Sequence, residues 1–242
     1  MAEIIFDGGS AASPGSQSIQ LGADTCTQVL NLASQLLQDA TSIQWSITDK
    51  MLPYMNLGIK ELVNIKPEAY SRIFNAPLAG GPRQLLPPGA LFIVDVESVL
   101  DLNNKPSSAV TLVDRVMMDR LLPGWLSISS GDIVQYVIKD QRNPEYFYVV
   151  PPPPVNTVQS AALVCACYPV EVTALQVGNV DVPFPLMNKY VPAIVNYIVS
   201  CCLIEETTIP NAQQKAIVFR QNFYNSLGVT ISSKAKSDAQ DV

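Results

Sequence analysis

The sequence predicts an α+β fold, in which a helical-bundle core of about four helices carries a β-rich insertion between its second and third main helices. Apolar residues recur at helical spacing in residues 23–77 and 183–228, which predicts the helical core domain. Residues 78–182 between them are rich in proline, valine and aromatic residues, typical of short strands and turns. A flexible N-terminal arm rich in glycine and serine (residues 1–22) and a polar C-terminal tail (residues 229–242) complete the chain.

The first two predicted helices lie before the insertion. The first begins at Asp24 or Thr25, either of which can cap it, and continues as one apolar stripe to Ala40. The second begins near Ser46 and ends before Pro67. Its apolar face is formed by Met51, Met55, Ile59, Leu62 and Val63. Pro53 falls inside this helix, so we expect a late start or a kink there.

The insertion is predicted to hold short strands and one short helix. We expect strands at Arg83–Leu86, Leu91–Val99, Ile133–Lys139, Tyr146–Val150 and Ala161–Tyr168, and a helix at Asp114–Leu122. In the strand Tyr146–Val150, both alternating faces are apolar. That strand is therefore either buried on two sides or covered on one side by a partner subunit.

Two further helices are predicted after the insertion. One runs from Pro185 to Glu205, and the break at Pro210-Asn211 separates it from the last helix. The last helix ends at Gly228, which suits a left-handed cap. Its apolar face is formed by Ala212, Ala216, Phe219, Phe223 and Leu227. Packing of this pair against the first pair would close the bundle.

Composition excludes several classes of enzyme. The chain has 242 residues, of which 48% are apolar, and it contains no histidine. Serine and cysteine nucleophiles that depend on histidine are therefore excluded. The 15 Lys and Arg residues are scattered, and the net charge is −6, so sequence-specific DNA binding is not expected. The sequence predicts a protein that is not an enzyme and has no cofactor.

The five cysteines leave two interpretations open. A zinc site built from Cys165, Cys167, Cys201 and Cys202 is one, although their spacing differs from the usual C-x₂₋₄-C pairs. In the other interpretation, which we favour, the cysteines are small buried residues of a protein in a reducing cytoplasm. No signal peptide is predicted, so we expect synthesis in the cytoplasm.

Three stretches carry a resemblance to a known family. The first comprises Trp45–Asp49, Met55–Val63 and Lys66-Pro67; the second comprises Pro123-Gly124-Trp125, Val134–Asp140 and Asn143–Pro152; the third comprises Tyr190–Tyr197, Asn211–Ala216, Phe223 and Leu227-Gly228. In order and spacing, over roughly residues 25–230, they resemble the head-to-tail adaptor (connector) proteins of tailed bacteriophages. The middle stretch is the most specific of the three.

The resemblance implies a structural virion protein in the head-tail neck, made in the host cytoplasm. Such adaptors form a ring, typically a dodecamer, which docks on the portal protein after DNA packaging. The ring extends the channel used in DNA ejection, so genomic DNA passes through it without sequence-specific binding. It also provides the attachment surface for the next tail or nozzle protein. No membrane contact, metal or catalytic residue is implied.

Candidate interface residues follow from composition and position. Trp45, Trp125, Tyr146 and Tyr148 could anchor a subunit interface, although each could equally be a core residue. Lys234 and Lys236 in the C-terminal tail are candidates for portal contact. A mean hydropathy of +0.20 with 15% charged residues fits a ring subunit, or a monomer with a large core.

Two other functions remain open at this point. One is a different neck component, such as a tail terminator or stopper, which would bind the same neighbours. The other is a carboxylate-based hydrolase, which requires two carboxylates facing each other in a cleft.

Overall fold

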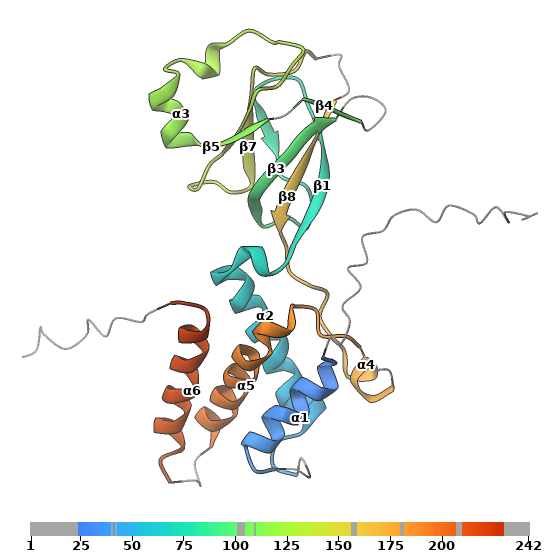
Figure 1. Cartoon of the computed structure of the whole chain (residues 1–242), viewed down its shortest axis with the longest axis vertical. Helices are drawn as coiled ribbons and strands as arrows, with labels where there is room; N and C mark the ends of the chain where they lie inside the picture. The colour runs from blue at the N-terminus through green and yellow to red at the C-terminus, as the bar shows by residue number, and fades with distance from the viewer. Residues whose placement is uncertain are drawn as a thin grey trace, which may run out of the picture.

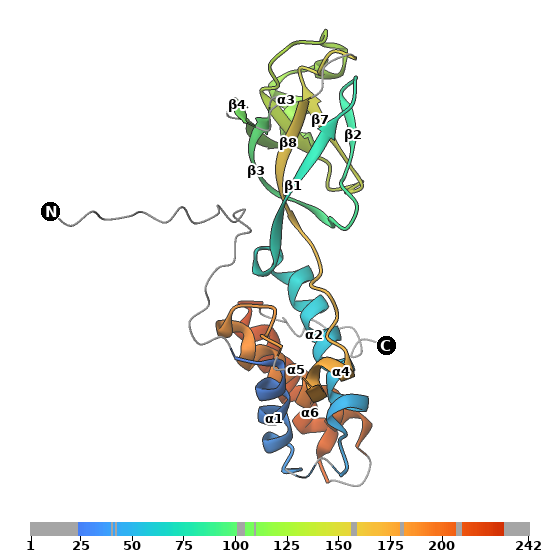
Figure 2. The same cartoon turned by 90° about the vertical axis from the view of Figure 1, so that its right-hand side faces the viewer.

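The computed structural model describes residues 24–39, 41, 43–100, 105–108, 110–155, 159–179, 182–206 and 210–229. These residues form a helical bundle at one end of an elongated molecule and a β lobe at the other (Figures 1 and 2). The chain enters the β lobe after its second bundle helix and returns to the bundle afterwards. The predicted α+β class, with a β-rich insertion in a helical core, is confirmed.

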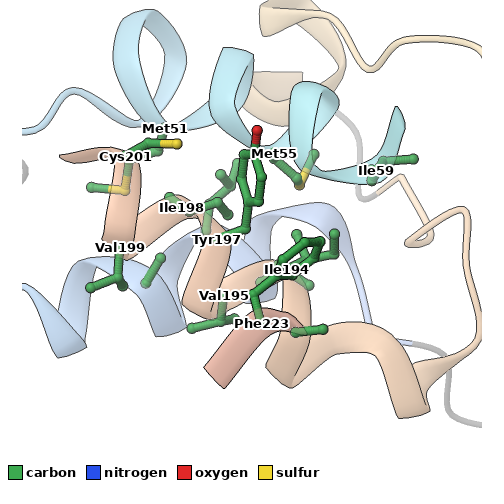
Figure 3. Packing of buried hydrophobic residues seen from close by; sticks show 14 of the residues in the cluster. Met51, Met55, Ile59, Ile194, Val195, Tyr197, Ile198, Val199, Cys201 and Phe223 are labelled. Atoms are coloured by element: carbon green, nitrogen blue, oxygen red, sulfur yellow. The ribbon is translucent and has the colours of Figure 1, made fainter. Parts of the chain in front are cut away.

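The bundle is built from four helices that share one hydrophobic cluster. They are α1 (Cys26–Leu36), α2 (Leu52–Ile65), α5 (Val191–Glu205) and α6 (Ala212–Ser226). Most residues of α5 are buried, because α1, α2 and α6 all pack against it. Figure 3 shows Tyr197 of α5 between Met55 of α2 and Phe223 of α6, with the rings of Tyr197 and Phe223 edge to face at 5.1 Å.

Helix α1 begins with a side-chain cap, as predicted, but it ends earlier than predicted. Thr25, rather than Asp24, is the N-cap: its hydroxyl accepts from the Gln28 backbone N–H, and the Gln28 side chain accepts from the Thr25 N–H. The helix ends at Leu36 instead of Ala40. Gln38 adopts a φ of 59°, which breaks the helical path two residues later.

Pro53 delays the second helix, as predicted. A π-helical turn, η1 (Ile47–Met51), precedes α2, and Pro53 is the second residue of α2. The Ser46 hydroxyl accepts a hydrogen bond from the Asp49 backbone N–H at the start of η1. Proline has no N–H and its ring clashes with the carbonyl four residues back in a regular helix. The wider π turn removes that conflict before α2 begins.

The β lobe contains two four-stranded sheets, ordered β1-β8-β3-β4 and β2-β7-β6-β5. Their strands are β1 (Ser71–Leu78), β2 (Arg83–Leu85), β3 (Phe92–Leu100), β4 (Pro106–Ser108), β5 (Thr111–Asp114), β6 (Tyr136–Lys139), β7 (Tyr146–Val150) and β8 (Gln159–Ala166). The pairs are antiparallel except β5–β6, which is parallel. A cluster that includes Val96, Phe147 and Leu163 joins the two sheets.

Strand β7 is buried on both faces by its own chain. Phe147 and Val149 belong to the cluster between the sheets. On the opposite face, Tyr148 and Val150 pack beneath helix α3 (Arg115–Leu121) and the 3₁₀ turn η3 (Trp125–Ser127). The first of the two interpretations of this strand, burial on both sides, is the one that the structure shows.

Several elements were not predicted, namely β1, β4, β5 and the short helix α4 (Ala174–Asn179). Because β1 begins at Ser71, the sheets start inside the range 23–77 that we expected to be helical core. Pro77 obscured this strand, but β1 lies at a sheet edge, where proline is tolerated. The chain is also back in the bundle by Val172, earlier than the predicted boundary at residue 182.

The remaining differences concern the termini and element lengths. Strand β6 begins at Tyr136 instead of Ile133, and α5 begins at Val191, after the 3₁₀ turn η4 (Asn188–Tyr190), instead of Pro185. The arm at residues 1–22 and all but Val229 of the predicted tail lie outside the described residues. Among the helices that the structure describes, none combines the length and apolar character required to cross a bilayer.

Candidate interaction surfaces

The predicted tryptophan anchors lie inside their own chain. Trp45 is 5% exposed in the bundle, and Trp125 is 1% exposed beneath α3. The indole N–H of Trp125 donates to Asp119 (2.7 Å), and its ring meets Tyr148 edge to face at 5.3 Å. Their role at an interface stays a prediction, but neither side chain offers much surface to a partner.

The two predicted tyrosine anchors are half-buried, and each is close to an arginine. The guanidinium of Arg83 lies 3.7 Å from the ring centre of Tyr146, and that of Arg115 lies 5.3 Å from the ring centre of Tyr148. These contacts order both rings within the β lobe. Their interface role is still a prediction, and Lys234 and Lys236 lie outside the described residues.

An exposed apolar surface, which we call the α3 ridge, lies directly above buried Trp125. Its members share apolar side chains that are more than a third exposed: Val116, Met117, Leu121, Leu122 and Leu126. Met118 of the same helix is buried below. The sequence does not reveal this ridge, because apolar and charged residues are mixed along α3 and only the fold shows which apolar side chains face solvent.

An ion pair between a half-buried arginine and a buried carboxylate fixes α3 on the β lobe. The Arg115 guanidinium contacts the Asp140 carboxylate at 2.5 Å, and Asp140 is 6% exposed. Burial alone would raise the pKa of Asp140, but hydrogen bonds from Arg115 and from the backbone N–H groups of Arg142 and Asn143 lower it overall. Asp114 caps the helix by accepting from the Val116 N–H (3.0 Å). The α3 ridge is thus presented by a well-anchored helix.

The bundle presents two uncharged helix faces to solvent. The first, the α1 face, consists of Gln28, Asn31, Leu32, Gln35 and Leu36. The second, the α6 face, consists of Gln214, Ile217, Val218, Gln221 and Asn225. Each helix exposes a stripe of amides and aliphatic side chains. The two helices lie on opposite sides of the bundle, with α5 between them (Figure 1).

Polar contacts to α2 hold α6 in one orientation. Tyr224 donates a hydrogen bond to Glu61 of α2, and Arg220 forms an ion pair with the same carboxylate at 3.6 Å. The Arg220 guanidinium also lies 4.0 Å from the ring centre of Tyr197. The hydrogen bond to Glu61 raises the pKa of Tyr224, and burial raises that of Tyr197 to about 12. These contacts direct the α6 face away from the bundle.

Comparison with protein families identifies the chain. The model of the SU10 adaptor protein family, a phage head-to-tail adaptor family, matches residues 24–241. The chain belongs to this family. A comparison with curated proteins found no match. The SU10 adaptor match confirms the resemblance that the three stretches carried, and it covers both the bundle and the β lobe.

Membership of the SU10 adaptor family implies a structural, non-enzymatic role in the virion neck. The geometry gives no support to the hydrolase alternative. A groove of about 480 Å³ at the base of the β lobe is lined by Phe92, Pro144 and Tyr146 and by two carboxylates, Glu68 and Asp140. Both carboxylates face cations, since Glu68 lies 3.9 Å from Lys66 and Asp140 is bound by Arg115. A glycoside hydrolase needs one carboxyl group with a raised pKa, whereas that of Asp140 is lowered.

The zinc interpretation of the cysteines gains no support from the structure. All five cysteines are buried free thiols. Cys165 lies in the cluster between the sheets, whereas Cys201 and Cys202 lie in the bundle cluster. Among the described residues, no group of three potential ligands gathers as a metal site requires.

Proposed function

We propose that this protein forms a ring at the head-to-tail junction of a tailed phage. The ring, typically a dodecamer in such adaptors, docks on the portal protein, extends the DNA channel and provides the attachment surface for the tail. The observation that carries the proposal is the family match over both lobes of the chain. The two uncharged faces on opposite sides of the bundle support it, because a head-to-tail ring requires two different contact surfaces on each subunit.

The net charge supports passage of DNA without binding. A channel built from a chain of net charge −6 does not present the clustered Lys and Arg residues that grip phosphates. Like charge between ring and DNA disfavours adhesion during ejection.

Different segments of the chain bind the partners at the two ends of the ring. We assign the tail or nozzle protein to the α3 ridge, which is apolar, exposed and distant from the bundle (Figure 1). We assign the portal to the C-terminal tail with Lys234 and Lys236, which the family match includes.

Native mass spectrometry of the full chain, alone and mixed with its portal protein, tests the ring. We expect one discrete large oligomer, either alone or with the portal. A protein that remains monomeric in both conditions contradicts the proposal. A tail terminator or stopper would be indicated instead if the ring bound the completed tail but not the portal.

Two variants test the attachment surfaces separately. Deletion of residues 231–242 should abolish portal binding and leave the oligomer mass unchanged apart from the deleted residues. The double variant Met117→Asp and Leu121→Asp should abolish binding of the tail-side protein while portal binding persists. Unchanged binding in either case would remove that segment from the proposal.

A further inference from the structure

We propose that the α1 face of one subunit packs against the α6 face of the next, and that this contact builds the ring. The inference rests on the proposed function in that it assumes that copies of the chain assemble. It goes further by naming the two surfaces that meet. The occupant of each face is therefore the opposite face of a second copy of this chain.

Charge is missing from these two faces and present elsewhere on the bundle. Helix α1 contains no charged residue, and α6 contains no Asp or Glu. The cations of α6, Lys215 and Arg220, flank the α6 face and are not part of it. Elsewhere, exposed ion pairs join Lys50 to Glu205 and Lys60 to Glu171. Surfaces that stay in water carry roughly a quarter to a third charged residues, whereas the centres of interfaces are depleted of charge.

Each of the two faces exposes a pair of neighbouring aliphatic side chains. Leu32 and Leu36 of α1 are 43% and 53% exposed and lie one turn apart. Ile217 and Val218 of α6 are 66% and 55% exposed. Each pair is flanked by amides, Asn31 and Gln35 on α1 and Gln214, Gln221 and Asn225 on α6, which both donate and accept hydrogen bonds. Two such faces can pair aliphatic side chains with each other and amides with each other, without an ion pair.

Placement of the faces makes the contact head-to-tail. Because α1 and α6 lie on opposite sides of α5, a subunit that uses its α6 face still has its α1 face available. Repetition of one such contact produces a ring when the rotation between neighbouring subunits closes, whereas pairing of two copies through the same face would produce a closed dimer. The helices also have comparable lengths, about 16 Å for α1 and 22 Å for α6 at ~1.5 Å per residue, so they can lie side by side.

Charge introduced into one face at a time tests the contact. Leu36→Glu alters the α1 face and Ile217→Glu alters the α6 face, and each position is more than half exposed, so the fold should survive. We expect both variants to lose the ring, by native mass spectrometry with and without the portal protein. Leu85→Glu, at an equally exposed leucine of the β lobe, is the matched control and should keep the ring. Circular dichroism should show the same helix content in all three.

Mixing the two variants gives the decisive result. Leu36→Glu retains an intact α6 face, and Ile217→Glu retains an intact α1 face. An equimolar mixture should therefore form a heterodimer through the intact pair and stop, because the remaining faces carry two like charges. A mixture that remains monomeric, or variants that keep the ring, would overturn the α1–α6 contact while leaving the adaptor function in place. A wild-type protein that forms no ring under any of these conditions would instead overturn the proposed function.

Discussion

Asn56 of α2 binds the backbone of Val172 through two hydrogen bonds. Its side-chain N–H donates to the Val172 carbonyl (2.9 Å), and its side-chain oxygen accepts from the Val172 N–H (3.2 Å). Val172 lies on the segment that returns from the β lobe, and it is buried in the bundle cluster. An amide is the side chain that can both donate and accept in this way. Asn56 lies in the first of the three stretches that resemble the adaptors, and this contact gives it a structural role.

Replacement of Asn56 should loosen the junction of the two lobes. In Asn56→Ala, the backbone groups of Val172 lose both partners, and we expect the free energy of unfolding to fall by about 1–3 kcal/mol. Urea unfolding followed by circular dichroism measures the change. Asn222→Ala is the control, because Asn222 is an exposed asparagine of α6 and should change stability by less than about 0.5 kcal/mol. Equal effects of the two substitutions would contradict the role of Asn56.

Gly58 lets α2 and α5 approach closely. A Cβ atom at this position would lie 2.8 Å from the Cδ1 atom and 3.0 Å from the Cγ atom of Tyr197, whose ring is buried. Alanine normally stabilises a helix interior by up to about 1 kcal/mol relative to glycine. We expect Gly58→Ala to lower the melting temperature nevertheless, because the Tyr197 ring must move against Phe223. A rise in melting temperature would show that the bundle accommodates the methyl group.

The Arg115–Asp140 pair predicts an acid-sensitive contribution to stability. The pKa of Asp140 is lower in the folded protein than its ordinary value of 3.8, so the folded state gains stability above that value and loses it as the pH falls below. Asp140→Asn should reduce the free energy of unfolding at neutral pH by about 1–3 kcal/mol and reduce this acid dependence. Asp132→Asn, at an exposed position of the same lobe, serves as the control. A wild-type to Asp140→Asn difference that does not shrink in acid would contradict the assignment.

The cysteines should be unreactive in the folded protein. Burial raises the pKa of Cys26 to about 11 and those of Cys165 and Cys202 to about 12, so little thiolate forms at about pH 8. We expect iodoacetamide to label the native protein slowly and all five cysteines rapidly in denaturant, as measured by mass spectrometry. Rapid labelling of one cysteine in native buffer would place that thiol at an accessible site.

Local periodicity explains which elements the sequence predicted. The helices around Val29, Ile59, Ile194 and Phe223 have long apolar patterns, and each of these residues is buried in the bundle. Strand β7 has the same bounds as its prediction, because its aromatic and β-branched residues favour a strand and the four prolines that follow end it. Such signals are contained within a short stretch of chain and do not depend on a distant partner.

Elements that depend on distant pairing were missed. Strand β1 pairs with β8, where Ser71 lies opposite Ala166, and no short-range pattern announces that contact. Strand β5 is held by a parallel pair with β6. For the same reason the sequence does not distinguish an aromatic residue that covers its own chain from one that covers a partner. Trp125 is a candidate for either role in the sequence, and the structure shows it packed in a core. The sequence shows that α1 carries no charged residue. Only the fold shows that α1 and α6 lie on opposite sides of the bundle.

The pairing of Ser71 with Ala166 also means that both ends of the β lobe leave the bundle side by side. A segment whose ends meet can be shortened, lengthened or exchanged without changing the path of the helices below it. Natural variation could therefore remodel the β lobe while the bundle keeps its contacts. The two lobes can evolve at different speeds, and a chimaera that carries a foreign lobe between residues 71 and 166 should retain the bundle fold.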